Sequence, residues 1–195
     1  MARQRGFDTA DALSKVMELF WEKGYEATSV TDLCETTGLG RGSLYAAFGS
    51  KQELYERSLR QYVDVTMHHL RDQLSRRVPL RQAVRDLLLD RIDESLAAGE
   101  RPGCLLVGAI VERSAHDTAT ARIAQDAITA TQAAFASTLH SARAVGEIPS
   151  ETDVESLAGF LTTMVQGLRV MSMSMPDRKL LTSIVDSALA ALPGE

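Results

Sequence analysis

The sequence predicts an all-α protein of about nine helices, with short helices near the N-terminus and longer ones after them. Apolar residues recur at three- and four-residue steps over most of the chain, which is the spacing of one helix face. Several of these segments are preceded by serine or threonine with an acidic residue three positions later, as in a capping box. Glycine or proline follows several of them and is expected to end the helix.

The composition is that of an ordinary globular protein. The chain has 195 residues, 45% hydrophobic and 24% charged, and this length suffices to bury a core. No apolar run approaches the ~20 residues of a membrane-spanning helix, and the N-terminal MARQRGFD lacks the apolar core of a signal peptide. We therefore expect a cytoplasmic protein without membrane contact. The two cysteines fit no disulfide framework or metal spacing, and we predict no metal and no cofactor.

The first helix is predicted over residues 9–23, with Asp8 as its cap. Its apolar stripe consists of Leu13, Val16, Met17 and Phe20. Before it, Arg3 and Arg5 form a basic tail. This tail is either a solvated terminus or an arm that reaches phosphate or the minor groove of DNA.

Residues 28–55 carry three helix signals in close succession. Ser29 begins a capping box for the second helix, and Gly38 is placed to end that helix in a left-handed conformation. A third short helix is predicted from Gly40, and Ser50 begins the capping box of a fourth. Two short helices joined by a glycine-containing turn form the helix-turn-helix pattern.

The third helix has two interpretations, an inert part of a bundle or a DNA-reading helix, and we favour the second. It is only about two turns long, too short to be stable alone. Its small residues let a backbone approach another surface closely, and a major groove is such a surface. The residues predicted to face DNA on it are Arg41, Gly42, Ser43, Tyr45 and Ala47. At the start of the second helix, Ser29 and Thr31 are placed to hold a phosphate.

Residues 9–55 resemble the DNA-binding domain of the tetracycline-repressor (TetR) family of bacterial transcription regulators. The matching residues are Phe20, Gly24, Tyr25, Thr28, Ser29, Val30, Leu33, Gly38, Leu39, Gly42, Ser43, Leu44, Tyr45, Phe48, Ser50, Lys51, Leu54 and Tyr55. The resemblance implies an all-helical homodimer, with a three-helix DNA-binding domain (residues 1–50) and a C-terminal regulatory and dimerisation domain (residues 51–195). It implies double-stranded operator DNA and a small-molecule effector as further partners, without identifying the effector.

The charge is acidic overall, at −5, and the N-terminal region is not basic in bulk. Residues 1–60 hold 8 Lys and Arg against 9 Asp and Glu. DNA binding must therefore depend on helix N-termini and on a few placed cations. These cations are Arg3, Arg5, Arg41 and Lys51. Lys51 looks like the family's phosphate-contacting lysine.

The fourth helix is predicted from Lys51 to about Arg76 as a strut that joins the two halves of the molecule. Five more helices are predicted to begin at Leu80, Cys104, Asp117, Thr152 and after Pro176. Residues 99–103 form a loop before the sixth helix. Thr152 and Glu155 are predicted to form a capping box for the eighth.

Cys104 has two interpretations. A free cysteine on a mostly apolar helix is usually a small core residue, and we favour this interpretation. The alternative is a thiol that senses oxidants or electrophiles, as in some TetR-family members that resemble this stretch. An effector pocket is predicted among the fifth to eighth helices, and several of its candidate residues are expected to be plain core. The candidates are Leu88, Cys104, Val107, Ile110, Val111, Phe135, Leu139, Met164 and Gln166.

The last two helices carry more apolar residues than one buried stripe requires. They either lie deep in the core of one chain or form a two-fold dimer interface, and we favour the dimer. The interface residues predicted are Leu157, Phe160, Leu161, Leu168, Leu181, Ile184, Val185 and Ala188. The function expected is a repressor that a small molecule or an electrophile releases from a palindromic operator. The alternatives are an effector-independent DNA binder and an enzyme, but the sequence contains no recognisable catalytic motif.

Overall fold

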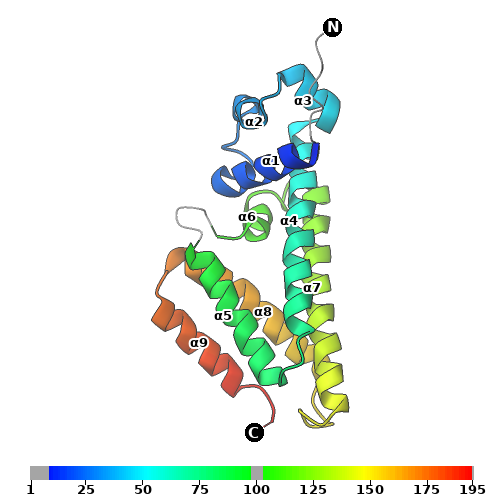
Figure 1. Ribbon diagram of the computed structural model, residues 1–195, viewed down its shortest axis with the longest axis vertical. Coiled ribbons are helices and arrows are strands. Elements are labelled where there is room, and N and C mark those ends of the chain that lie inside the picture. The colour runs from blue at the N-terminus through cyan, green and yellow to red at the C-terminus, as the bar shows by residue number, and fades with distance from the viewer. Residues whose placement is uncertain (1–8, 98–102, 195) are drawn as a thin grey trace.

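The computed structural model describes residues 9–97 and 103–194, and this part of the chain forms nine α-helices (Figure 1). They are α1 (Thr9–Lys23), α2 (Val30–Thr37), α3 (Arg41–Phe48), α4 (Lys51–Leu74), α5 (Leu80–Ala97), α6 (Leu105–Glu112), α7 (Thr118–Ala144), α8 (Val154–Ser174) and α9 (Arg178–Ala190). The predicted all-α fold is confirmed. Arg3, Arg5, Asp8 and most of the predicted loop at residues 99–103 lie outside the described residues.

The first three helices and the N-terminal part of α4 form the head of the molecule (Figure 1). Its buried side chains from these helices include Val16, Phe20, Leu33, Leu44, Phe48, Leu54, Tyr55 and Leu59. The capping boxes predicted at α2 and α4 are both present, because Ser29 and Ser50 each exchange hydrogen bonds with the acidic residue three positions later. Local sequence signals therefore predict where α2 and α4 begin.

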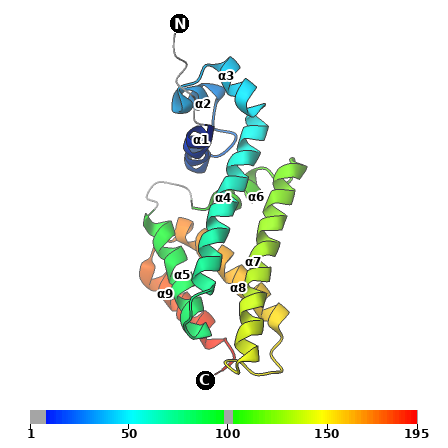
Figure 2. The ribbon, with the colours of Figure 1, turned by 45° about the vertical axis from the view of Figure 1, so that its right-hand side comes forward.

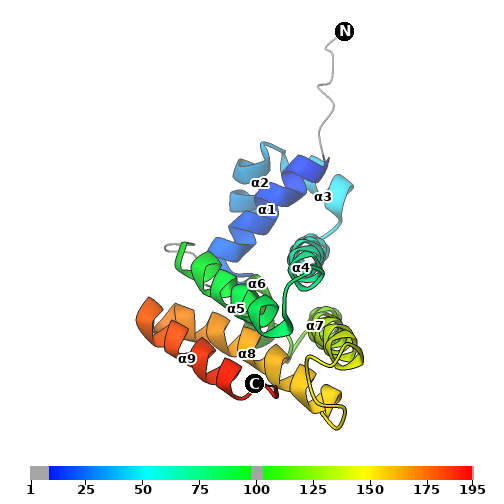
Figure 3. The same cartoon turned by 60° about the horizontal axis from the view of Figure 1, so that its bottom comes forward.

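The remaining part of α4 packs with α5, α7, α8 and α9 to form the body, and α4 and α7 run side by side along the long axis (Figures 1 and 2). In Figure 3, α4 and α7 are seen nearly end-on, with α5, α8 and α9 crossing the view beside them. The body core includes Leu87, Leu88, Ile92, Phe135, Leu139, Leu161, Leu181 and Val185.

The short helix α6 lies at the junction of head and body (Figure 2). Its residues Leu105, Leu106 and Ala109 are buried in the same cluster as the head core, together with Ile123 and Ala124 of α7. The apolar core of the head therefore continues past residue 50, through α4 into α6 and α7. The division into domains at residue 50 stays a prediction about the chain.

Some predicted helix ends were wrong. The N-cap of α8 is Asp153, which accepts a hydrogen bond from the backbone N–H of Ser156 (3.1 Å), and not Thr152. Aspartate is at least as good an N-cap as threonine, so the helix begins one residue later than predicted. Cys104 is the N-cap of α6, with extended backbone, and does not lie in its first turn.

None of the helices in the described part of the chain combines the length and the apolar character needed to cross a membrane.

Candidate DNA-binding surface and effector cavity

The turn between α2 and α3 requires a glycine. Gly38 ends α2 with φ +69°, in the left-handed region that side chains with a Cβ rarely adopt. Gly40 then caps α3 with extended backbone and without a side-chain hydrogen bond to the helix. The first backbone N–H groups of α3 receive no acceptor from this cap, and such groups bind phosphate well.

Five of the ten residues predicted to face DNA are exposed in the head. Arg41, Gly42 and Ser43 are exposed on the first turn of α3, and Tyr45 is half-buried, with its ring centroid 5.6 Å from the Arg41 guanidinium carbon. Ser29 and Thr31 are exposed at the start of α2.

One alanine differs from the expectation. Ala47 is half-buried against the head core, whereas Ala46 is the exposed alanine of α3. Ala46 follows Gly42 by four residues, and this spacing could have identified it. The DNA contacts of all these residues stay predictions.

Lys51 is the first residue of α4 and follows shortly after the end of α3, the helix predicted to read DNA. It is half-buried, and its Nζ is 4.2 Å from the centroid of the Tyr25 ring. A cation at this distance from an aromatic ring is attracted by the ring's negative face. Lys51 is thus held against the Tyr25 ring of the α1–α2 turn, and its phosphate contact stays a prediction.

A cavity of about 360 Å³ lies between head and body. Its walls include Met17 and Trp21 of α1, Tyr62 of α4, Glu94 of α5 and Arg169 of α8. Further lining residues are Val65, Thr66, His69, Ser95, Ala97, Gly103 and Cys104. This volume is within the range of small-molecule sites, and the wall combines aromatic surface with a few polar groups.

Cys104 in this wall is buried, at 3% exposure, but its surroundings are polar. The Tyr62 hydroxyl donates to its Sγ at 3.4 Å, and Nη1 of Arg169 donates to the same sulfur at 3.0 Å. Arg169 is itself only 8% exposed. A guanidinium buried at this depth needs compensating groups, and the sulfur is one of them.

The titratable groups around the sulfur are shifted by their environment. Burial raises the pKa of Tyr62, and the neighbouring Cys104 raises it further. Burial also raises the pKa of Glu94, against the opposing effect of Arg91. Burial alone would lower the pKa of Arg169, but the acidic groups of Cys104, Tyr62 and Glu94 raise it overall. The site therefore holds a charged guanidinium beside a sulfur in a poorly solvated cavity.

The predicted effector residues are not brought together. Cys104 borders the large cavity, and Gln166 borders a second space of only about 20 Å³ that Arg169 also lines. Leu88, Phe135 and Leu139 are packed in the body core. Val107, Ile110 and Met164 are half-buried, and Val111 is 82% exposed. The candidates therefore do not share one pocket: Leu88, Phe135 and Leu139 are core residues, as was expected of several of them, and contact of the others with an effector stays a prediction.

The cavity residues missed from the sequence are Trp21, Tyr62, Glu94 and Arg169. Arg169 carried a usable signal, because it follows Val165 by four residues on the apolar side of α8. A charged residue at such a position needs a partner or a functional role. The other three have no comparable local signal.

Five of the predicted interface residues lie inside the protomer. They are Leu161, Leu168, Leu181, Val185 and Ala188, all buried within a single chain. A surface contact with a second chain cannot use them, so this part of the expectation needs correction: the surplus apolar residues of α8 and α9 fill the protomer core. Leu157, Phe160 and Ile184 are half-buried and remain available to a partner.

The described residues contain no group of three or more His, Cys, Asp or Glu side chains arranged to hold a metal ion.

A helix-turn-helix head on a helical body, with a cavity between the two, is an arrangement typical of DNA-binding transcription regulators. Two family profiles match the chain: "Bacterial regulatory proteins, tetR family" over residues 12–57 and "Tetracyclin repressor-like, C-terminal domain" over residues 81–188. The chain belongs to the TetR family of transcription regulators, and the resemblance found in the sequence is confirmed.

Individual relatives agree with this assignment. The repressor ComR of Escherichia coli is 30% identical over 98% of this chain and 91% of its own length. The uncharacterised regulator YezE of Bacillus subtilis is 28% identical over 98% of this chain and its full length. Among solved structures, a cysteine mutant of the TetR-family regulator CifR in complex with a 26-bp operator DNA is 31% identical, with a TM-score of 0.88 over 98% of this chain and all of that one.

Proposed function

We propose that this protein is a dimeric repressor that is released from a palindromic operator when a small molecule occupies or modifies the cavity at Cys104. The observation that carries the proposal is the composition of the cavity wall, which α1 of the head and α4, α5 and α8 of the body build together. An occupant that binds one arrangement of head and body better than the other shifts the population of DNA-binding forms.

Binding to a palindrome requires two heads at a fixed distance, and the surface best suited to pairing is the outer side of α8 and α9. The half-buried Leu157, Phe160 and Ile184 lie there, and Val170 of α8 is 45% exposed. A two-fold contact over these residues has to hold the two recognition helices about one turn of DNA apart to match a palindromic operator. ComR is a transcriptional repressor, and a cysteine mutant of CifR binds a 26-bp operator. Both relatives support the proposal that this protein is a repressor that binds operator DNA.

The cavity favours an effector with a small apolar body and an acceptor atom. Trp21, Met17 and Tyr62 offer the apolar contact, and Arg169 offers a hydrogen-bond donor close to the sulfur of Cys104. For an electrophilic effector with an electron-poor carbon–carbon double bond, the sulfur of Cys104 bonds to one carbon while the π bond breaks, and the thiol proton is transferred to the other carbon. The guanidinium of Arg169 compensates the negative charge that develops during the attack. The polar neighbours of Cys104 make a sensing role stronger than the plain core role expected from the sequence.

The test uses the single tryptophan of the chain, which lies in the cavity wall. A Cys34→Ser protein keeps Cys104 as the only thiol, and a Cys34→Ser, Cys104→Ser protein removes both. Each is titrated onto DNA from upstream of its own gene with and without N-ethylmaleimide, and Trp21 fluorescence is followed in parallel.

We expect reagent-dependent release and a fluorescence change only in the protein that keeps Cys104. Operator binding that is indifferent to the reagent, with Cys104 modified, contradicts the covalent part and leaves a reversible ligand as the signal. Absence of any sequence-specific shift, also on a randomised operator library, contradicts the proposal as a whole.

The proposal places the protein in the cytoplasm, where the chromosome is, and treats it as a regulator and not as an enzyme. The support is that the related proteins named above are transcription regulators. The rival interpretation, an effector-independent DNA binder, predicts that no occupant of the cavity changes operator affinity.

A further inference from the structure

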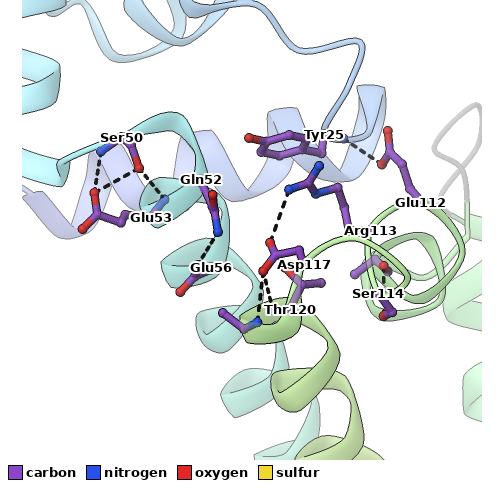
Figure 4. Close-up of polar contacts among 12 residues, drawn as sticks. Tyr25, Ser50, Gln52, Glu53, Glu56, Glu112, Arg113, Ser114, Asp117 and Thr120 are labelled. Atoms are coloured by element: carbon purple, nitrogen blue, oxygen red, sulfur yellow. Dashed lines mark hydrogen bonds and ion pairs between the residues drawn. The ribbon is translucent and has the colours of Figure 1, made fainter.

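The C-terminal end of α6 holds the turn between α1 and α2. Glu112, the last residue of α6, accepts a hydrogen bond from the backbone N–H of Tyr25 (2.9 Å; Figure 4). Its other carboxylate oxygen accepts from the backbone N–H of Glu26 (2.8 Å). Hydrogen bonds to an ionised carboxylate are shorter and stronger than neutral ones. A residue of α6 therefore satisfies two backbone groups of the α1–α2 turn.

Gly24 makes this approach possible. Its φ of +78° is in the left-handed region, and a Cβ built there would lie 3.1 Å from Oε2 of Glu112. A side chain at this position would press against the carboxylate and strain the backbone. The turn is thus shaped to receive the Glu112 side chain from α6.

Arg113 holds the same turn from a second direction. Its guanidinium carbon is 4.1 Å from the centroid of the Tyr25 ring, and Nη1 lies 3.1 Å from Oε1 of Glu26. Nη2 lies 3.4 Å from Oδ2 of Asp117, the N-cap of α7 (Figure 4). The guanidinium therefore links the α1–α2 turn of the head to the start of α7.

Asp117 anchors this arrangement to the body. Its carboxylate accepts from the backbone N–H of Ala119 (3.0 Å) and Thr120 (3.2 Å) and from the Thr120 hydroxyl (2.8 Å). Burial alone would raise the pKa of Asp117, but the hydrogen bonds from Thr120, Ala119 and Arg113 lower it overall. The carboxylate is therefore ionised at neutral pH and pairs with Arg113.

We call the contacts of Glu112 and Arg113 with the α1–α2 turn, together with the Arg113–Asp117 pair, the joint. The ring of Tyr25 lies between this joint and Lys51, one of the residues predicted to contact DNA. It lies within 4.1 Å of the Arg113 guanidinium carbon and within 4.2 Å of Nζ of Lys51, both measured to the ring centroid. Tyr25 also packs edge-on against Tyr55 of α4, with centroids 5.0 Å apart. Four residues after Tyr25, the N-cap Ser29 starts the helix-turn-helix.

We propose that Glu112 and Arg113 are positioning residues for DNA binding: they fix the α1–α2 turn, and through Tyr25 they set the place of Lys51 and of the recognition helix. Neither residue needs to touch DNA for this role. The proposal rests on the DNA-binding function of the family and is independent of any chemistry at Cys104.

The test compares operator affinity and its salt dependence in Glu112→Gln with those of the wild type. Glutamine has nearly the same shape, but its amide presents one N–H₂ group to two backbone donors, so one hydrogen bond is lost and one donor faces another. Glu155→Gln serves as the control, because Glu155 is an exposed glutamate at the start of α8, far from the turn.

We expect Glu112→Gln to weaken operator binding about tenfold, as the loss of a hydrogen bond to a charged group implies. The slope of the logarithm of affinity against the logarithm of salt concentration should also become smaller in magnitude, because a displaced Lys51 no longer neutralises its phosphate. Glu155→Gln should bind like the wild type. Thermal unfolding and sedimentation show that each variant is folded and in the same oligomeric state.

A second pair of variants keeps the proposal falsifiable if Glu112→Gln folds poorly. Tyr25→Phe keeps the aromatic ring between the two cations and should bind operator like the wild type, whereas Tyr25→Leu should lower affinity and salt slope. The proposal is overturned if folded Glu112→Gln and Tyr25→Leu retain the wild-type affinity and slope while only their unfolding temperature falls. In that case the joint has a purely structural role. These measurements contain no effector, so failure of the sensing proposal leaves their outcome unchanged.

Discussion

Replacing Lys51 by glutamine should change how salt affects operator binding. Each cation that neutralises a phosphate contributes about −0.9 to the slope of log affinity against log salt, and a dimer with two heads loses two such contacts. The slope of the variant should therefore be smaller in magnitude by about 1.8. Between about 50 and about 200 mM salt, the wild type should then lose about 12-fold more affinity than the variant.

The assay is fluorescence anisotropy on a labelled operator at several salt concentrations. Lys179→Gln makes the same charge change on an exposed residue of α9 in the body and should leave the slope unaltered. The reasoning fails if Lys51→Gln has the wild-type slope, because Lys51 then holds the Tyr25 ring without contacting phosphate. A reduced affinity with an unchanged slope would also count against a phosphate contact and would assign the loss to the displaced turn.

Three further outcomes are expected. Leu88→Ala should lower the free energy of unfolding by about 2–5 kcal/mol, because the Leu88 side chain is fully buried. Val111→Ala, at an 82% exposed site, should change it by less than about 0.5 kcal/mol. Urea unfolding measures both. Asp117→Asn keeps a side chain that can cap α7 but removes the carboxyl group that titrates. The wild type's advantage should be complete above the unfolded pKa of about 3.9 and should vanish as pH falls through the lower folded pKa, as urea unfolding at several pH values would show. Val170→Glu should dissociate the dimer in sedimentation runs, and Val145→Glu, at an exposed site at the end of α7, should not.

The head was predictable from sequence because its signals are local. A capping box, a left-handed glycine and a three- or four-residue apolar spacing each depend on residues less than five positions apart. Ser29, Gly38 and Ser50 all have the predicted roles at helix ends. The same locality explains the error at α8, where Thr152 and Asp153 both satisfy the local pattern and only the backbone decides between them.

The cavity and the joint were not predictable in the same way, because their residues are far apart in the chain. The bond from Arg169 to Cys104 spans 65 positions and that from Tyr25 to Glu112 spans 87. Apolar periodicity shows that a residue is buried, but not which element covers it. For this reason Leu161 and Val185 were assigned to a dimer interface although they fill the core of one chain.

The two ends of α6 explain how these long-range contacts can act together. Its N-cap, Cys104, lines the cavity, and its last residue, Glu112, holds the α1–α2 turn. Between them Leu105, Leu106 and Ala109 are buried in the head core, so the helix cannot shift without disturbing apolar contacts with α1 and α4. Eight helical residues span only about 12 Å and behave as a rigid rod. If an occupant of the cavity displaces α6, the α1–α2 turn that Glu112 holds must move with it or lose its two hydrogen bonds.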